Sequence, residues 1–396
     1  MTTSGAVHKL VDIDADNGVD TAQQCLKQTI LDQRYMSACI RFARRHEGLT
    51  GENPSVGAFI VRYEIDGPII VGRGVTDLGG RPHAEVRALK DAGELARDAC
   101  IYVTLEPCSH FGKTPPCANA LIDAGIARVV VAVNDPDIRV SGQGFDKLRA
   151  AGIEVVTDLR TEQAQFGLAG YLTRKTKNRP FVTLKLALSS NGLMGLRSGE
   201  QVKITDAISN GQVQLLRSIN DAILVGSGTV INDNPSLACR LKGLEHSSPT
   251  RIILDRDLTI SAKSQLVQTA IDHPTILATK SQNLMVQTLS TQGVDVVPLQ
   301  GENDAEQLDY LLTKLADKGI STLLVEGGAM IAQSFLDAGL VDRLVLFQSQ
   351  NAIDTEDKSQ MVHAPITPTI IPDNFVMFNQ LTFGQDIMYE YALRSR

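Results

Sequence analysis

The sequence contains no tryptophan, and aromatic residues make up only 5% of its 396 residues. It also lacks any apolar run close to the roughly 18 residues that a membrane-spanning helix needs. Residues 1–20 lack the basic start and the following apolar stretch of a secretory signal peptide. We therefore expect a cytoplasmic, globular protein with no membrane partner.

An excess of basic residues is also missing, and cysteine is scarce. Lysine and arginine number 38 against 45 aspartates and glutamates, so the formal net charge is -7. A dedicated nucleic-acid binder usually carries a basic excess, and we expect no nucleic-acid partner. Six cysteines are too few for a disulfide scaffold in a chain of this length. The 43% of hydrophobic residues supports folded domains, and the length predicts two or three of them.

Composition and periodicity divide the chain into three parts. Residues 1–30 are polar and show little periodicity, so we expect a disordered or loosely docked extension. A helical pattern starts at Tyr35, and strands then alternate with helices, which predicts a layered α/β domain over 31–177. The lysines and the proline of KTKNRPF (175–181) indicate a boundary between this domain and the next. A second alternation predicts another α/β domain over 178–396.

The apolar runs locate the expected elements of both domains. In the first domain we expect strands over 57–62, 68–72, 100–105, 128–133 and 153–156, and helices over 83–96, 115–127 and 144–151. In the second domain we expect strands over 181–188, 222–226, 251–255, 275–279, 294–298, 321–328, 342–348 and 387–394, and helices over 209–219, 308–319 and 330–339.

One histidine and two cysteines of the first domain stand at strand-to-helix junctions. His83 opens a helix, Cys108 follows a strand, and Cys117 opens the next helix. An imidazole and two thiolates suit zinc, and three protein ligands leave a fourth position for a catalytic water. Glu85 lies two positions after His83, where it can move protons without binding the metal. His-x-Glu followed by Pro-Cys and a second cysteine is the pattern of zinc deaminases.

The segment SHFGKTPP separates the two cysteines and carries two further candidates. His110 and Lys113 can reach a substrate from this loop, and Lys113 can neutralise a phosphate group. Solvated loop side chains are the alternative for both residues.

The first domain resembles the deaminase domain of the bifunctional deaminase–reductase family of riboflavin biosynthesis. The resemblance is carried by HAE (83–85), TLEPCSHFGKTPPC (104–117) and NPSVG (53–57). It implies a cytidine-deaminase-like three-layer fold, with Glu85 as the catalytic acid and base. It also implies that His83, Cys108 and Cys117 bind one zinc ion. The residues implied to bind the deaminase substrate are Asn53, His110 and Lys113.

The second domain lacks a Gly-x-Gly-x-x-Gly motif on its first strand, which argues against a Rossmann dinucleotide site. Its glycines instead follow two later strands, in VGSGTV (225–230) and EGGAMIAQS (326–334). Glycines at a helix start let phosphate oxygens approach backbone N–H groups, although simple turns are the alternative.

The resemblance extends to the second domain, where it implies a dihydrofolate-reductase-like fold that uses NADPH. It is carried by LKLALSSNG (184–192), SGE (198–200), LLR (215–217), GSGTV (226–230), DNPSLACR (233–240) and VEGG (325–328). Lys185 and Glu326 are implied to be catalytic. The positions implied to contact the substrate are Gln201, Arg217, Leu237, Arg240 and Glu326. The positions implied to contact NADPH are Ala187, Lys203, Thr229, Asp233, Gly328, Ala329, Met330, Ile331, Ala332, Gln333 and Ser334.

Three segments of the second domain depart from the family pattern. Gln201-Val202-Lys203 stands where the family has an aromatic residue, Asn191 replaces an aspartate, and 347–361 replaces an Ala-Pro stretch. These departures leave open a deaminase whose reductase half has lost activity. An RNA-editing deaminase is a weaker alternative, because the net charge is -7 and the two cysteines are nine positions apart. A non-catalytic zinc protein is also weaker, because Glu85 supplies an acid and base beside the metal-binding residues.

We therefore expect a bifunctional enzyme of riboflavin biosynthesis, a homo-oligomer acting on a phosphorylated pyrimidine. The resemblance implies zinc-dependent deamination of 2,5-diamino-6-(5-phosphoribosylamino)pyrimidin-4(3H)-one. It implies that NADPH then reduces the ribosyl chain of the deaminated product to a ribityl chain.

Overall fold

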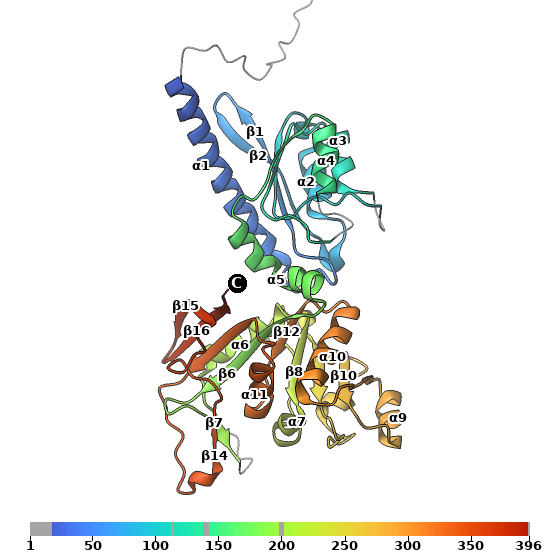
Figure 1. Ribbon diagram of the computed structural model, residues 1–396, viewed down its shortest axis with the longest axis vertical. Coiled ribbons are helices and arrows are strands. Elements are labelled where there is room, and N and C mark those ends of the chain that lie inside the picture. Colours follow the sequence, from blue (N-terminus) through green and yellow to red (C-terminus); the bar gives the residue numbers. More distant parts are fainter. Residues whose placement is uncertain (1–17, 112–114, 138–141, 198–201, 395–396) are drawn as a thin grey trace, which may run out of the picture.

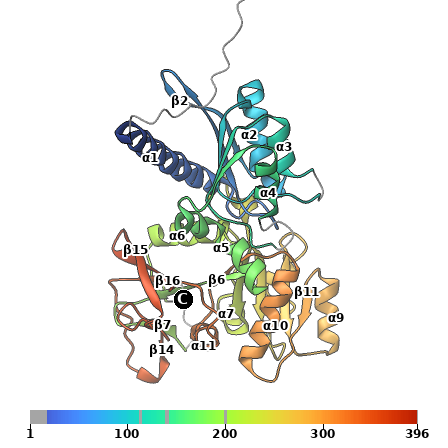
Figure 2. The same ribbon diagram turned by 45° about the horizontal axis from the view of Figure 1, so that its top comes forward.

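The chain folds into two lobes, described here from a computed structural model (Figures 1 and 2). The structure describes residues 18–111, 115–137, 142–197 and 202–394. One lobe is built on a five-stranded sheet and the other on a nine-stranded sheet. Within these ranges, no helix is both long enough and apolar enough to cross a membrane.

The five-stranded sheet of the first lobe has the order β2-β1-β3-β4-β5. Its strands are β1 (Gly57–Glu64), β2 (Gly67–Val75), β3 (Cys100–Val103), β4 (Arg128–Val131) and β5 (Glu154–Val156). β1 runs antiparallel to β2 and β3, whereas β3, β4 and β5 are parallel. The carboxyl ends of the parallel strands therefore meet at one edge, where loops can gather side chains.

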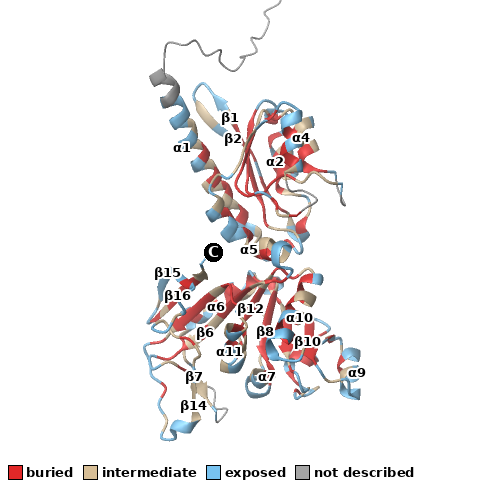
Figure 3. Ribbon diagram, in the orientation of Figure 1, coloured by how far each residue is buried: buried red, intermediate tan, exposed pale blue. Residues whose placement is uncertain are grey.

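Helices cover both faces of this sheet and make three layers. α1 (Gly18–Ala43) and α5 (Thr161–Lys177) lie together on one face. α2 (Ala84–Ala92), α3 (Cys117–Asp123) and α4 (Gln143–Ala150) cover the other. Residues of the central strands are buried on both sides, as Figure 3 shows.

The expectation of a loose extension up to residue 30 is wrong for its last part. α1 begins at Gly18 and is continuous through the region where we expected the helix to start, near Tyr35. Gln28 in this part donates hydrogen bonds to Asp32 Oδ1 at 2.8 Å and to the Tyr63 hydroxyl at 2.9 Å. The polar residues mislead because this part of the helix is largely exposed, while the second half has the buried residues that pack on the sheet. Residues 1–17 lie outside the described part of the chain.

The nine-stranded sheet of the second lobe has the order β11-β10-β9-β8-β12-β6-β13-β16-β15. Its strands are β6 (Phe181–Leu188), β8 (Ala222–Gly226), β9 (Thr250–Leu254), β10 (Thr275–Thr279), β11 (Asp295–Pro298), β12 (Thr322–Val325), β13 (Arg343–Gln348), β15 (Phe375–Phe383) and β16 (Asp386–Leu393). The strands from β11 to β13 are parallel, and β16 and β15 are antiparallel additions. β7 (Leu193–Leu196) and β14 (Met361–His363) form a separate two-stranded sheet.

Two apolar cores sandwich the nine-stranded sheet. α10 (Asp304–Asp317) and α11 (Ala329–Asp337) pack on one face. α6 (Ala207–Ser218), α7 (Ser227–Asp233), α8 (Gln265–Gln268) and α9 (Leu284–Thr291) contribute to the other. In β6, Leu184 and Leu186 face the first core. Alternation along the strand therefore turns Lys185 towards the second face, on which α6 lies.

α5 and the loop after α1 join the two lobes (Figure 1). Phe166 of α5 packs edge-on against Phe378 of β15, with ring centroids 5.5 Å apart. The Arg343 guanidinium lies over both rings, 5.3 Å and 5.6 Å from their centroids. Gly170 of α5 meets the start of β12 so closely that a Cβ would lie 2.5 Å from Thr322 Cγ2. The lobes are thus packed against each other through α5.

Candidate functional site

The structure brings His83, Cys108 and Cys117 together at the carboxyl edge of the five-stranded sheet. Their ligand atoms all lie within 4.8 Å of one another. His83 is the N-terminal flanking residue of α2, Cys108 follows β3, and Cys117 is the first residue of α3. His83 Nδ1 lies 3.7 Å from Cys108 Sγ and 3.4 Å from Cys117 Sγ. The convergence of these three donors from separate elements agrees with the sequence prediction.

The electrostatics of this cluster suit a divalent cation. The contact with the Cys117 thiol lowers the pKa of Cys108 to about 4. Burial opposes this shift, and His83 adds to it. The Cys117 backbone N–H also donates to Cys108 Sγ at 3.3 Å. The same contact and burial raise the pKa of Cys117, because two adjacent thiolates repel each other. A zinc ion removes that repulsion, and one imidazole with two thiolates is a set of donors that fits zinc.

Glu85 lies in the first turn of α2, only 4% exposed, beside the three donors. Burial raises its pKa to about 7, partly opposed by the nearby His83. A carboxyl group that titrates near neutral pH can both accept and donate a proton. The structure thus places a carboxyl group that titrates near neutral pH next to the cluster of His83, Cys108 and Cys117.

These residues border a pocket of about 350 Å³. It is lined by Glu52, Asn53, Pro54, Val56, Thr76, Arg81, His83, Glu85, Leu105, Glu106, Cys108, His110, Phe111, Asp135, Asp137, Tyr171, Arg174 and Lys175. The Asn53 amide donates to Gly80 O at 3.1 Å. The buried Nδ1 of His110 has no hydrogen-bond partner within the described ranges, so a ligand can supply one. Lys113, the other loop residue that we expected here, lies outside the described residues.

Sequence reasoning missed the far wall of this pocket. Asp135 and Asp137 follow β4, and Tyr171, Arg174 and Lys175 belong to α5. The only signal in the sequence was a pair of aspartates after a buried strand. The residues of α5 reach the pocket because of how this helix packs against the sheet, and no local sequence motif predicts that packing.

The second cluster joins Lys185, Arg217 and Glu326 inside the second lobe. Arg217 Nε and Nη2 donate to the two oxygens of Glu326 at 2.9 Å and 3.1 Å. Lys185 Nζ lies 3.7 Å from Glu326 Oε2 and 5.9 Å from the centre of the Phe347 ring. Glu326 thus engages the guanidinium group of Arg217, a residue that the resemblance assigns to the substrate. The three residues come from β6, α6 and the end of β12.

Burial and charge oppose each other in this triad. Burial alone would raise the pKa of Glu326, but the adjacent Lys185 and Arg217 outweigh it and lower that pKa. Burial lowers the pKa of Lys185, partly offset by Glu326. Glu326 therefore stays ionised and holds a desolvated ammonium group next to it.

Glycine-rich turns lie next to this triad, after β8 and β12. A Cβ on Gly226 or Gly327 would come within 2.8 Å or 2.5 Å of Ile331, so α11 approaches the sheet edge closely. Gly328 precedes α11 without a side-chain cap and has open space around it. Uncapped N–H groups at a helix start bind phosphate, so this turn fits a phosphate-bearing cofactor.

The remaining predicted residues of the second lobe take different positions. Ala187 lies on β6 opposite Phe347, and Thr229 and Asp233 lie on α7. The segment Gly328, Ala329, Met330, Ile331, Ala332, Gln333 and Ser334 forms the start of α11, with Ala332 buried in the core. Leu237 is buried with φ +57, and its neighbour Ala238 accepts a hydrogen bond from Arg217. Arg240 and Lys203 are exposed, and Gln201 lies outside the described residues.

Two of the departures from the expected pattern meet in the structure. The Asn191 side chain donates to Ile353 O at 2.8 Å and accepts from Ile353 N at 3.2 Å. A carboxylate could make only the second of these bonds, because it has no N–H to donate. The asparagine and the altered 347–361 segment therefore complement each other.

Known protein families match both lobes. Residues 29–133 match the family described as cytidine and deoxycytidylate deaminase zinc-binding region, and residues 180–349 match the RibD C-terminal domain. These matches confirm the expected deaminase-like and reductase halves and their two cofactors, zinc and NADPH.

Relatives and solved structures match most of the chain. The riboflavin biosynthesis protein RibD of Aquifex aeolicus is 42% identical over 317 residues, which cover 80% of this chain and 86% of that protein. RibD of Escherichia coli is 37% identical over 327 residues, 80% of this chain and 87% of that protein. The structure of Acinetobacter baumannii RibD superposes with a TM-score of 0.81 at 32% identity, covering 93% of this chain and 100% of that one.

A fourth relative is named by its activities. The structure of a diaminohydroxyphosphoribosylaminopyrimidine deaminase/5-amino-6-(5-phosphoribosylamino)uracil reductase from Thermotoga maritima has a TM-score of 0.79 at 30% identity. It matches over 93% of this chain and 100% of its own. The identity and coverage extend across both lobes, and this chain belongs to the RibD family of riboflavin biosynthesis proteins.

Proposed function

We propose that this chain catalyses two successive reactions of riboflavin biosynthesis, one in each lobe. The first is hydrolytic deamination of 2,5-diamino-6-(5-phosphoribosylamino)pyrimidin-4(3H)-one. The second is NADPH-dependent reduction of the deaminated product's ribosyl chain to a ribityl chain. The observation that carries the proposal is the convergence of His83, Cys108 and Cys117 beside the buried Glu85, in a chain whose residues 180–349 match the RibD C-terminal domain.

In the deaminase lobe, His83, Cys108 and Cys117 would hold zinc. The metal supplies an activated water as nucleophile near neutral pH. Glu85, whose pKa of about 7 suits both roles, would accept a proton from the attacking water and return one to the departing amino group. Asn53 and His110 orient the pyrimidine ring from the pocket wall, and Lys113 is assigned to the same substrate.

In the reductase lobe, Glu326 and Arg217 fix the Lys185 ammonium beside the carboxyl edge of β6 and β12. When bound there, NADPH would supply the hydride for ribose C1′ of the imine tautomer. Lys185 is placed to donate the accompanying proton, and Arg240 is free of the triad to meet the substrate phosphate. The start of α11, with Ala187, Lys203, Thr229 and Asp233, is assigned to the cofactor, and Gln201, Leu237 and Glu326 are assigned to the substrate.

A split assay on one purified protein tests both assignments. We expect ammonia release matched by NADPH oxidation when zinc, the ribosylated substrate and NADPH are present. In the variant Cys108→Ser, zinc content and ammonia release should be lost, while NADPH oxidation on the deaminated intermediate continues. Loss of both activities in a folded variant contradicts independent sites. Ammonia release without NADPH oxidation in the wild type instead supports a deaminase with an inactive reductase half.

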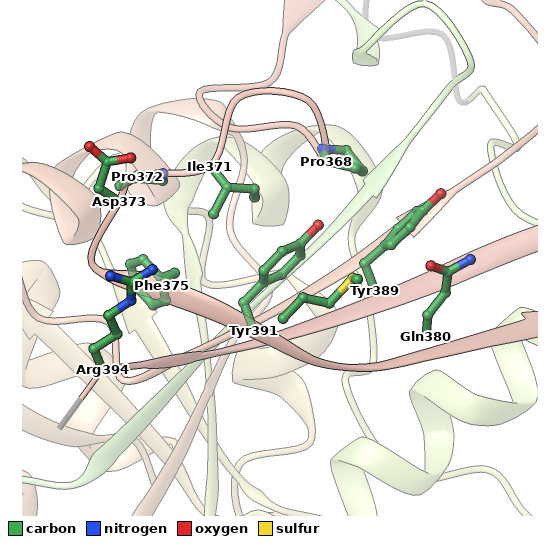
Figure 4. Close-up of a pocket in the computed structure, with 10 residues that line it drawn as sticks. Pro368, Ile371, Pro372, Asp373, Phe375, Gln380, Tyr389, Tyr391 and Arg394 are labelled. Carbon is green, nitrogen blue, oxygen red and sulfur yellow. The ribbon is translucent and has the colours of Figure 1, made fainter.

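We also propose a homo-oligomer formed along β15, the edge strand of the large sheet. Val376, Met377 and Leu381 of this strand are exposed, and edge strands readily pair with another chain. A hollow of about 410 Å³ adjoins it, where Tyr389 and Tyr391 lie beneath Pro368 and Ile371 (Figure 4). Light scattering should give at least twice the chain mass of 42.8 kDa. The free cysteines agree with a reducing compartment, and we place the enzyme in the cytoplasm.

A further inference from the structure

Helix α5, which joins the two lobes, forms one wall of the deaminase pocket. Tyr171, Arg174 and Lys175 project from this helix to line the pocket. The pocket therefore has a wall that comes from outside the strand–helix units carrying the metal-binding residues.

Tyr171 contacts a buried carboxylate that lines the same pocket. Its hydroxyl lies 3.0 Å from Asp135 Oδ1 and 3.1 Å from Oδ2, so it donates one shared hydrogen bond to the carboxylate. Asp135 is only 6% exposed, and the Asp137 backbone N–H donates to Asp135 Oδ1 at 2.9 Å. These bonds fix the orientation of the carboxylate and leave it further lone pairs for a ligand in the pocket.

The order of the strands indicates which part of a substrate reaches Asp135. The metal-binding residues and Glu85 come from α2, α3 and the end of β3. Asp135 follows β4, the next strand in the sheet, and faces α5. The reacting ring carbon must lie by Glu85, so the remainder of the substrate extends towards Asp135 and α5.

The chemistry of this end suits a sugar phosphate. A carboxylate accepts hydrogen bonds from ribose hydroxyls, as in dinucleotide sites. Arg174 Nε is buried without a hydrogen-bond partner among the described residues, which leaves a donor for an anionic group. The Lys175 ammonium also lines the pocket, where it pairs with Asp137 Oδ2 at 3.0 Å.

We propose that Tyr171 is a positioning residue that orients Asp135 to bind the ribose hydroxyls of the deaminase substrate, with α5 forming the sugar-phosphate end of the site. The inference rests on the proposed deaminase function and deepens it. It assigns substrate recognition in the first reaction to the helix that leads directly into β6 of the reductase. Tyr171 acts on the sugar and not on the ring, so its loss should weaken binding of the ribosylated substrate alone.

The test compares Tyr171→Phe with the wild type, using two probes. The first is steady-state deamination of the ribosylated 5′-phosphate substrate. The second is competitive inhibition by 2,5,6-triaminopyrimidin-4(3H)-one, which is the same ring without the sugar. In Tyr171→Phe we expect KM for the ribosylated substrate to rise about tenfold, as for loss of one hydrogen bond to a charged group. The Ki of the free ring and kcat should change by less than about threefold.

Matched variants separate positioning from a structural effect. Thr176→Val removes a hydroxyl from the exposed side of the same helix, where Thr176 Oγ1 donates to Leu172 O at 2.8 Å, and should leave KM unchanged. Asp135→Asn should also raise KM for the ribosylated substrate. Adding Tyr171→Phe to Asp135→Asn should raise this KM little further, because the tyrosine acts through that carboxylate. NADPH oxidation on the deaminated intermediate reports that each variant is folded.

Two results would overturn the inference. One is a KM in Tyr171→Phe equal to that of Thr176→Val. The other is an equal rise in KM and in the Ki of the free ring, which would mean that Tyr171 shapes the whole pocket. A wild-type protein that releases no ammonia contradicts the proposed function instead, so the two failures are distinguishable.

Discussion

Two glutamates, Glu85 in the first lobe and Glu326 in the second, have pKa values that are shifted in opposite directions. Burial raises the pKa of Glu85 to about 7, and the single nearby histidine only partly offsets this effect. Burial likewise opposes ionisation of Glu326, yet the adjacent Lys185 and Arg217 lower its pKa. The number of neighbouring cations thus decides whether a buried carboxyl can exchange protons or serves as a fixed anion.

Replacing Glu326 with glutamine should abolish the second activity and spare the first. Without the anion, Lys185 and Arg217 repel each other and the ammonium loses its fixed position. NADPH oxidation on the deaminated intermediate should fall about 100-fold or more, as for loss of a positioned proton donor. Ammonia release should change by less than about twofold. Glu245→Gln, at an exposed turn of the same lobe, should change neither rate, and a reductase rate unaffected by Glu326→Gln would contradict the role of the triad.

At the scale of elements, α1 is held to its sheet by a buried polar network. Asp32 of α1 accepts two hydrogen bonds from Arg128 of β4, each of 2.9 Å, and one from the hydroxyl of Tyr102 of β3. Burial opposes ionisation of Asp32, but the bonds from Arg128, Tyr102 and Gln28 outweigh it, so the pKa of Asp32 is lowered. The ionised carboxylate therefore stabilises the folded state.

The sign of this shift predicts how stability depends on pH. A carboxyl whose pKa is lowered by folding adds stability above its unfolded pKa of about 4, and loses it as pH falls through the folded value. Asp32→Asn should cost about 3 kcal/mol at pH 7, because Arg128 loses its buried anion and keeps the exposed Glu154, 2.9 Å away, as its partner. The difference from wild type should shrink below about pH 4.

Urea unfolding followed by circular dichroism at pH 7 and pH 3.5 measures both effects. Asp91→Asn removes an exposed ion pair of 3.8 Å with Arg73 and should cost less than about 1 kcal/mol at either pH. An Asp32→Asn penalty that is the same at both pH values would show that Asp32 acts through packing alone.

Local sequence patterns anticipated much of this architecture, and long-range contacts account for the rest. The convergence of His83, Cys108 and Cys117 was predictable because each stands at a strand–helix junction within a short motif. Tyr171 was not, because its partner Asp135 belongs to a different element and only the path of α5 brings them together. β15 was also missed: it is an edge strand whose apolar residues are exposed, so it shows no clear inside and outside. The helical start of α1 was hidden by its polar surface.

At the scale of the whole molecule, α5 belongs to both lobes. Its residues line the deaminase pocket, and its glycines lie where the lobes meet. A Cβ on Gly170 would lie 2.5 Å from Thr322 Cγ2 and 3.0 Å from Ser321 O, at the start of β12. A Cβ on Gly167, three residues earlier, would meet only Glu47 Oε1, at 3.5 Å. The missing side chain of Gly170 therefore lets α5 pack closely on β12, whereas Gly167 lies at no such close contact.

Alanine at these two positions should change stability in opposite directions. Alanine favours a helix over glycine by up to about 1 kcal/mol, so Gly167→Ala should raise the thermal midpoint slightly. Gly170→Ala has the same propensity gain, but it forces α5 away from β12 and should lower the midpoint by several degrees. Calorimetry and amide hydrogen exchange over α5 would measure both. If Gly170→Ala is as stable as Gly167→Ala, the close packing of α5 on β12 does not hold the lobes together. A destabilised Gly170→Ala with raised deaminase KM would show that lobe packing also keeps Tyr171 in place.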